Sequence, residues 1–295
     1  MSNPTSYFSA PASKLDPTLF EGRSLKAWVR SGITAMLNDF LGLHYRHSDL
    51  WARPYLAGSG VSYQWESARE PGDLDCLIGI NHVQFRKANP EFAGLSDKEI
   101  SAQLNEEFHE NLQMSTENWN GYELTFYALV NEDIRLIKPY AAYDLKYNEW
   151  TVTPNPQAAP PTNPEWDRIA DSDAEKAHQI ITRFNGALQD TQVMRNDPMR
   201  RNAENKLTIA AAQGNALFNE IHENRSLAFS PVGEGYGDFH NYRWQAGKRS
   251  GAINDLRKIR SYMKSTLQNP SAKYGVELPD ASTLVRRAAT YRNTL

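Results

Sequence analysis

Residues 58–80 read GSGVSYQWESAREPGDLDCLIGI, and this stretch decides the fold. It begins with a glycine and serine turn, and the Pro71-Gly72 pair ends the segment that follows. Asp73 and Asp75 then stand at the head of an apolar run. We expect residues 73–80 to form a strand with the two aspartates on one face, because successive side chains of a strand point to opposite faces.

The spacing of the two aspartates favours a cation site. Residues i and i+2 of a strand lie about 6.6 Å apart, so both carboxylates would point to one place and repel each other. A divalent cation removes that conflict, and carboxylate oxygens suit Mg²⁺ or Mn²⁺. The turn Gly58-Ser59-Gly60 offers backbone amides and a hydroxyl that can hold a phosphate. The pattern is typical of phosphoryl or nucleotidyl transfer.

The neighbouring segments predict helices and strands that form an α+β core. Residues 96–99 read SDKE, a capping box that predicts the start of a helix. The other elements follow from apolar periodicity. We expect a helix from residue 23, a strand over 51–55, the start of a helix over 61–66, a helix over 96–114, a strand over 123–130 and a hairpin over 140–153.

The chain divides at a proline-rich segment. Five prolines fall within residues 154–164, which predicts a semi-rigid linker. We therefore assign residues 1–19 to a disordered or loosely packed N-terminus, 20–153 to a catalytic core, and 165–295 to a mainly helical domain. Helical periodicity in the last region is clearest over 169–188, 207–221 and 252–267.

Charge and composition narrow the classes of protein. The 295 residues carry a net charge of −3, but the first 164 hold 13 Lys and Arg against 20 Asp and Glu, and the remainder 19 against 15. An acidic part beside a basic part fits a metal site and an acceptor site.

The single cysteine, Cys76, excludes an internal disulfide and is expected to be a small buried hydrophobe. We find neither an apolar run long enough to span a membrane nor a pattern typical of a secretory signal, so we expect a cytoplasmic protein.

The residues around the aspartates resemble the DNA polymerase β-like nucleotidyltransferases. That family's signature is an apolar residue, Gly, then Gly or Ser, a spacer of about ten to thirteen residues, and Asp-x-Asp in an apolar strand. This chain has Ala57-Gly58-Ser59, thirteen intervening residues, and DLDCLI over residues 73–78. The similarity extends over roughly residues 25–153 and implies a small mixed sheet with helices.

The resemblance also implies roles for individual residues. Asp73 and Asp75 would bind two Mg²⁺ or Mn²⁺ ions, and a third carboxylate would join them at the metal that activates the acceptor hydroxyl. Glu123 fits this third place best because it opens the next predicted strand, and Asp144 is the less favoured alternative. Gly58 and Ser59 would hold the β and γ phosphates, with pyrophosphate as product.

Residues 237–249, GDFHNYRWQAGKR, place aromatic and basic residues together in the second region. Such a mixture suits base stacking and phosphate contact. It is equally typical of a helix with a buried aromatic face and a solvated charged face. The candidates for nucleotide or acceptor contact are Tyr242, Arg243, Trp244, Gln245, Lys248 and Arg249.

These observations predict metal-dependent transfer of a nucleoside monophosphate from a triphosphate such as ATP to a hydroxyl acceptor. The basic and aromatic residues favour RNA as the acceptor, with a tRNA 3′ end as one example. Three alternatives stay open: a catalytically silent nucleotide-binding protein on the same fold, a protein or small-molecule acceptor, and a metal-dependent phosphodiesterase. The fold does not choose among acceptors.

Overall fold

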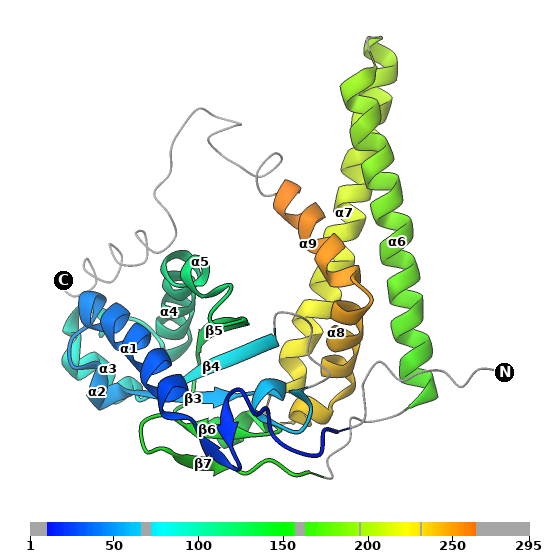
Figure 1. Cartoon of the computed structure of the whole chain (residues 1–295). Coiled ribbons are helices and arrows are strands. Elements are labelled where there is room, and N and C mark those ends of the chain that lie inside the picture. Colours follow the sequence, from blue (N-terminus) through cyan, green and yellow to red (C-terminus); the bar gives the residue numbers. More distant parts are fainter. Residues whose placement is uncertain (1–10, 66–71, 157–162, 195, 231, 264–295) are drawn as a thin grey trace. The chain divides into compact units, whose positions relative to one another are not determined.

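The structure is a computed structural model that describes residues 11–65, 72–156, 163–194, 196–230 and 232–263 (Figure 1). The described residues form two compact units, one up to residue 156 and one from residue 163. The first unit combines a sheet with helices and the second is helical. The fold class is therefore α+β.

A five-stranded mixed sheet organises the first unit. Its strand order is β5-β4-β3-β6-β7, in which β4 and β5 run parallel and every other neighbouring pair is antiparallel. The strands are β3 (Ala52–Ala57), β4 (Gly72–Ile80), β5 (Tyr122–Ala128), β6 (Ala142–Asp144) and β7 (Glu149–Val152). The strand predicted over 73–80 and the hairpin predicted within 140–153 are confirmed.

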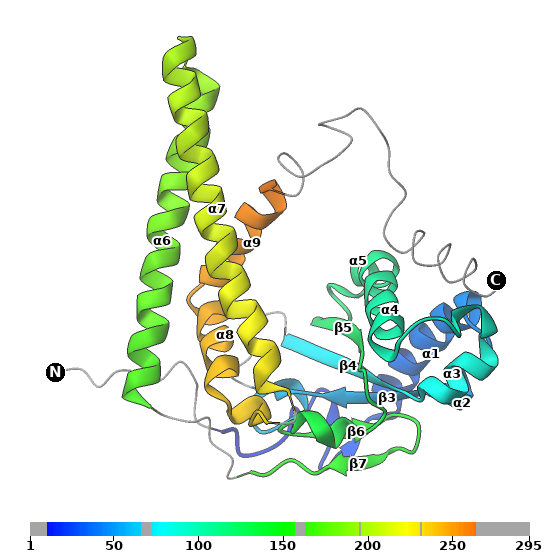
Figure 2. The same ribbon diagram turned by 180° about the vertical axis from the view of Figure 1, so that it is seen from behind.

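Two helices cover one face of this sheet, as Figures 1 and 2 show. They are α1 (Ala27–His44) and α4 (Asp97–Asn111). Their apolar stripes pack on Leu74, Cys76 and Ile78 of β4, none of which is exposed. The remaining elements of this unit are β1 (Phe20–Glu21), β2 (Ser24–Leu25), α2 (Ser48–Trp51), η1 (Ser59–Val61), α3 (His82–Ala88), η3 (Pro90–Phe92), α5 (Gln113–Thr116) and η4 (Ile134–Ile137).

The predicted capping box is present at the start of α4. The Ser96 hydroxyl accepts from the Glu99 backbone N–H at 3.3 Å, and the Ser96 N–H donates to Glu99 Oε2 at 2.8 Å. Each side chain thus satisfies a backbone donor that the first helical turn leaves unpaired.

Three segments differ from their predictions. Residues 20–25 form the β1–β2 hairpin, so the first helix begins at Ala27 and not at residue 23. Where a helix start was expected over 61–66, η1 ends at Val61 and residues 62–64 form a bend and a turn; residue 66 lies outside the described residues. Residues 11–19 do not fit the loose packing predicted for 1–19: Leu15 and Leu19 are buried, and Asp16 accepts from the Tyr122 hydroxyl at 2.6 Å.

The second unit consists of helices around its own core. Its two longest helices, α6 (Pro164–Val193) and α7 (Asp197–Ala228), lie side by side in both views (Figures 1 and 2). The shorter elements are η5 (Gly235–Gly237), α8 (Phe239–Arg249) and α9 (Ala252–Tyr262). The prediction of a helical region is confirmed for the described residues, and its part beyond residue 263 lies outside them.

No described helix is both long enough and apolar enough to cross a lipid bilayer. The long helices α6 and α7 carry charged side chains along their length.

Candidate metal and phosphate site

The parallel pairing of β4 and β5 brings three carboxylates to one face of the sheet. Asp73 pairs with Glu123 and Asp75 pairs with Thr125. Paired residues of adjacent strands point to the same face, and adjacent strands lie about 4.8 Å apart. Asp73, Asp75 and Glu123 are all half-buried, whereas the intervening Leu74 is fully buried on the opposite face.

The turn after β3 lies beside the first aspartate. Strand β3 runs antiparallel to β4 and ends with Ala57 opposite Asp75, so the next residues pass the start of β4. A Cβ on Gly60 would lie only 2.7 Å from the Asp73 carbonyl oxygen. Gly58 has φ 91° and ψ −162°, a conformation that is essentially restricted to glycine. Both glycines are thus needed for the turn to approach β4.

Thr125 is a residue of this face that sequence reasoning missed. Its hydroxyl donates to Asp75 Oδ1 at 3.1 Å. A donor on one carboxylate oxygen fixes the orientation of the other. The signal in the sequence was its position two residues after Glu123, which places both side chains on the same face of the strand.

Cys76 lies on the opposite face from the carboxylates and is fully buried. Burial raises the pKa of its thiol far above the ordinary range, and the nearby Asp75 charge raises it further. The thiol therefore stays protonated at neutral pH, which agrees with a small buried hydrophobe and not with a nucleophile.

Asp144 occupies a different environment from Glu123. It is fully buried, and its Oδ2 accepts from Arg53 Nε at 2.7 Å. Its Oδ1 accepts from the backbone N–H groups of Lys146 and Tyr147 at 2.8 and 2.9 Å. These contacts fix the tight turn between β6 and β7, so the geometry favours Glu123 as the third carboxylate.

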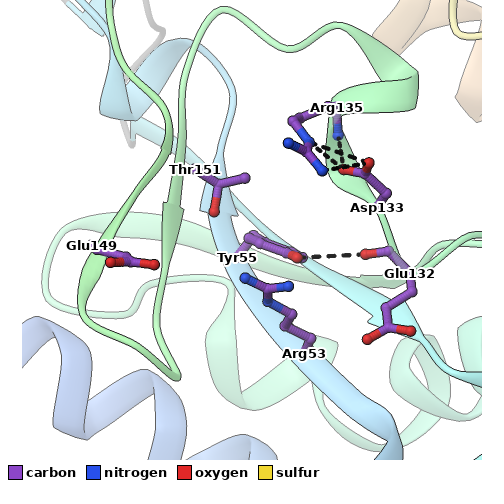
Figure 3. A pocket seen from close by; sticks show the side chains of 7 residues that line it. All are labelled: Arg53, Tyr55, Glu132, Asp133, Arg135, Glu149 and Thr151. Carbon is purple, nitrogen blue, oxygen red and sulfur yellow. Dashed lines mark hydrogen bonds and ion pairs between the residues drawn. The ribbon is translucent and has the colours of Figure 1, made fainter.

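A pocket of about 380 Å³ lies on the same face of the sheet, toward the start of β3, where Arg53 and Tyr55 line it (Figure 3). Its charged groups include an Arg135–Asp133 ion pair at 2.9 Å. The Tyr55 hydroxyl donates to the Glu132 backbone oxygen at 3.4 Å, and burial raises its pKa to about 12. An apolar cluster that includes Ala57 and Leu77 lies between Tyr55 and the aspartates along the strands. The pocket is therefore separate from the carboxylate site.

The predicted cluster on α8 divides between core and surface. Tyr242 and Trp244 are buried, at 1% and 3% exposure. The Arg243 side chain forms ion pairs with Asp173 and Glu220. These three are positioned as structural residues of the helical unit. The other three candidates are more accessible: Gln245 and Lys248 are half-buried, and Arg249 is exposed.

The carboxylate face has the chemistry for a magnesium or manganese site, because its donors are all oxygens. In the described part of the chain, however, no three His, Cys, Asp or Glu side chains already converge as the ligands of one metal ion.

No family model, curated protein or solved structure matches the chain. The site is therefore interpreted from its own residues: three carboxylates, one hydroxyl that orients a carboxylate, and a glycine turn beside them. Together they form a surface that suits a cation and a phosphate.

Proposed function

We propose that the first unit is a metal-dependent nucleotidyltransferase of the polymerase β-like kind. It transfers a nucleoside monophosphate from a triphosphate to a hydroxyl acceptor, and RNA is the acceptor class that we favour. The observation that carries the proposal is the pairing of Asp73 with Glu123, because it places a third carboxylate next to the Asp73–Asp75 pair.

Each part of the site has a role in this reaction. Asp73 and Asp75 would hold the cations, which would neutralise the phosphate charge and lower the pKa of the acceptor hydroxyl. Glu123 would serve as a further ligand or accept the hydroxyl proton. The turn at Gly58 and Ser59 holds the β and γ phosphates, which leave as pyrophosphate. Catalysis then rests mainly on positioning and charge neutralisation.

The direct test is an incubation of the full chain with each α-labelled nucleoside triphosphate, Mg²⁺ or Mn²⁺, and total tRNA, protein or metabolite pools. We expect release of pyrophosphate and label in the RNA pool, and no product in EDTA. Label in the protein or metabolite pool would support nucleotidyl transfer but would identify a protein or a small molecule as the acceptor. Triphosphate binding with no product in any pool indicates the catalytically silent alternative. Hydrolysis of a phosphodiester without any transfer indicates the phosphodiesterase.

Thr125→Val tests the orientation of Asp75. The substitution keeps the shape of the side chain and removes the hydroxyl that donates to Asp75 Oδ1. Loss of such a contact behind a metal ligand lowers metal affinity by about 10–100-fold. We expect that decrease in Mn²⁺ affinity, measured by electron paramagnetic resonance. Thr125→Ser keeps the hydroxyl and is expected to bind Mn²⁺ nearly as the parent does; equal affinity in both variants would contradict the role.

A further inference from the structure

Three arginines gather around a group of aromatic rings in the helical unit. The Arg225 and Arg257 guanidinium carbons lie 5.2 and 5.6 Å from the centre of the Trp244 ring. The Arg260 guanidinium carbon lies 4.9 Å from the centre of the Phe218 ring. His222 contacts both rings, with centroid distances of 5.4 Å to each. None of these arginines belongs to the cluster predicted over 237–249.

The packing of α9 against α7 brings these side chains together. Phe218, His222 and Arg225 follow one another at steps of four and three residues, so they share a face of α7. A Cβ on Gly214 would lie 2.8 Å from Ile259 Cδ1, so the glycine permits the close approach of α9. Arg257 and Arg260 on α9 then lie beside that face of α7.

Two arginines of this group, Arg225 and Arg260, form no ion pair within the described residues. Of the acidic side chains close by in the sequence, Glu220 pairs with Arg243 at 2.8 Å and Asp255 pairs with Lys258 at 3.0 Å, whereas Glu223 is exposed and its charge acts on His222.

Two buried donors of the group also lack a partner. Arg225 Nε and Trp244 Nε1 are buried and make no hydrogen bond with any described residue. A buried donor without an acceptor destabilises the fold, so most such donors in proteins are paired with protein, water or ligand. A ligand with several acceptor oxygens would satisfy donors of this kind.

We propose that Arg225, Arg257 and Arg260 form a binding site for a phosphate group beside His222 and Trp244. Guanidinium groups match phosphate oxygens in charge and in hydrogen-bond geometry. Trp244 does not stack on a base there, because it is buried and two guanidinium groups lie within 6 Å of its ring centre. The site thus recognises phosphate and not base identity, and it is independent of the carboxylate site.

His222 provides a reporter for this site. Its pKa is lowered by partial burial and by the charges of Arg260, Arg225 and Arg257, while Glu223 opposes the shift. A phosphate among the three arginines would offset their charge and raise the His222 pKa. Because phosphate then binds more tightly to the protonated ring, its affinity would increase as the pH falls through the His222 pKa.

The test measures binding of three probes to the full chain in EDTA, so that no cation at Asp73 and Asp75 can hold them. The probes are a single-stranded RNA 12-mer, ATP and inorganic phosphate. We expect Arg225→Gln and Arg260→Gln each to weaken binding by roughly tenfold. If only the RNA binds, the ligand is a backbone phosphodiester. If ATP binds as well, the site also accepts nucleotides. If inorganic phosphate binds as well, a single phosphate group is sufficient.

Lys258→Gln is the matched control. It removes one positive charge from α9, the helix that carries Arg260, at a side chain that is paired with Asp255. We expect it to bind within about twofold of the parent, since exposed ion pairs contribute little. Circular dichroism would verify that all variants are folded. The proposal is overturned if no probe binds, if the two arginine variants bind like Lys258→Gln, or if phosphate leaves the His222 pKa unchanged in an NMR titration.

Discussion

Asp73→Asn and Asp75→Asn are each expected to reduce nucleotidyl transfer by roughly a thousandfold, because a bound metal ion contributes several kcal/mol to stabilising the charge of the transition state. Asparagine keeps the size of the side chain and one oxygen but removes the charge that holds the cation. Both residues are half-buried on the β4 face away from the core, so the variants should still fold. The measurements are the rate of pyrophosphate release and Mn²⁺ affinity.

Asp39→Asn is the control for general loss of negative charge. Asp39 is an exposed aspartate on α1, and α1 packs on the opposite face of the sheet. We expect it to retain the parent rate and the parent Mn²⁺ affinity. A folded Asp73→Asn, Asp75→Asn double variant with full activity would exclude this face as the active site.

The choice between Glu123 and Asp144 can be tested in the same assay. Glu123→Gln should reduce the rate by at least about a hundredfold without changing stability, as expected for a ligand or general base. Asp144→Asn should mainly reduce stability, because it removes the charge that pairs with Arg53. The opposite pattern, with a slow folded Asp144→Asn variant and an active Glu123→Gln variant, would exchange the two roles.

Arg53→Met is expected to lower the free energy of unfolding by about 3 kcal/mol, because it leaves the buried charge of Asp144 without its cationic partner. Asp144 has no exposed side-chain surface, and Arg53 Nε is its nearest cationic partner at 2.7 Å. Two backbone N–H groups still donate to Asp144, which places the effect at the lower end of the usual range. Urea unfolding should show a midpoint roughly 1–2 M lower.

Arg135→Met is the matched control in the same pocket (Figure 3). Arg135 also pairs with an aspartate, Asp133, but its side chain is 69% exposed. Exposed ion pairs contribute about 0–1 kcal/mol, so its unfolding midpoint should barely change. Equal destabilisation by the two variants would show that burial of Asp144 does not determine the effect.

Local chemistry explains which features could be predicted from the sequence. The alternation of Asp73, Leu74, Asp75 and Cys76 predicted the two faces of β4 because a strand has a strict period of two. The capping box predicted the start of α4 because Ser96 and Glu99 bond only to nearby backbone. The apolar residues around Ile33 and Leu37 predicted α1, although not its first residue, which the preceding hairpin determines.

Three other features, which depend on partners distant in the sequence, were not predicted. Asp16 lies in a segment expected to be loose, yet it is buried and accepts a hydrogen bond from Tyr122, 106 residues away. The sequence could not decide whether the aromatic residues of α8 contact a nucleotide or form a buried face, because the burial of Trp244 depends on α7 and α9. The arginine group around Trp244 forms only because two helices pack closely at Gly214.

The sequence by itself determined the α+β class, the pair of carboxylates on one face of β4, and the glycine turn that precedes it, since each depends on residues close together in the chain. Only the tertiary structure placed Glu123 next to Asp73, added Thr125 beside Asp75, and assigned Asp144 to a buried pair with Arg53. The physical reason is strand register: hydrogen bonds between β4 and β5 align residues about fifty positions apart, and that alignment is set by the packing of the whole sheet.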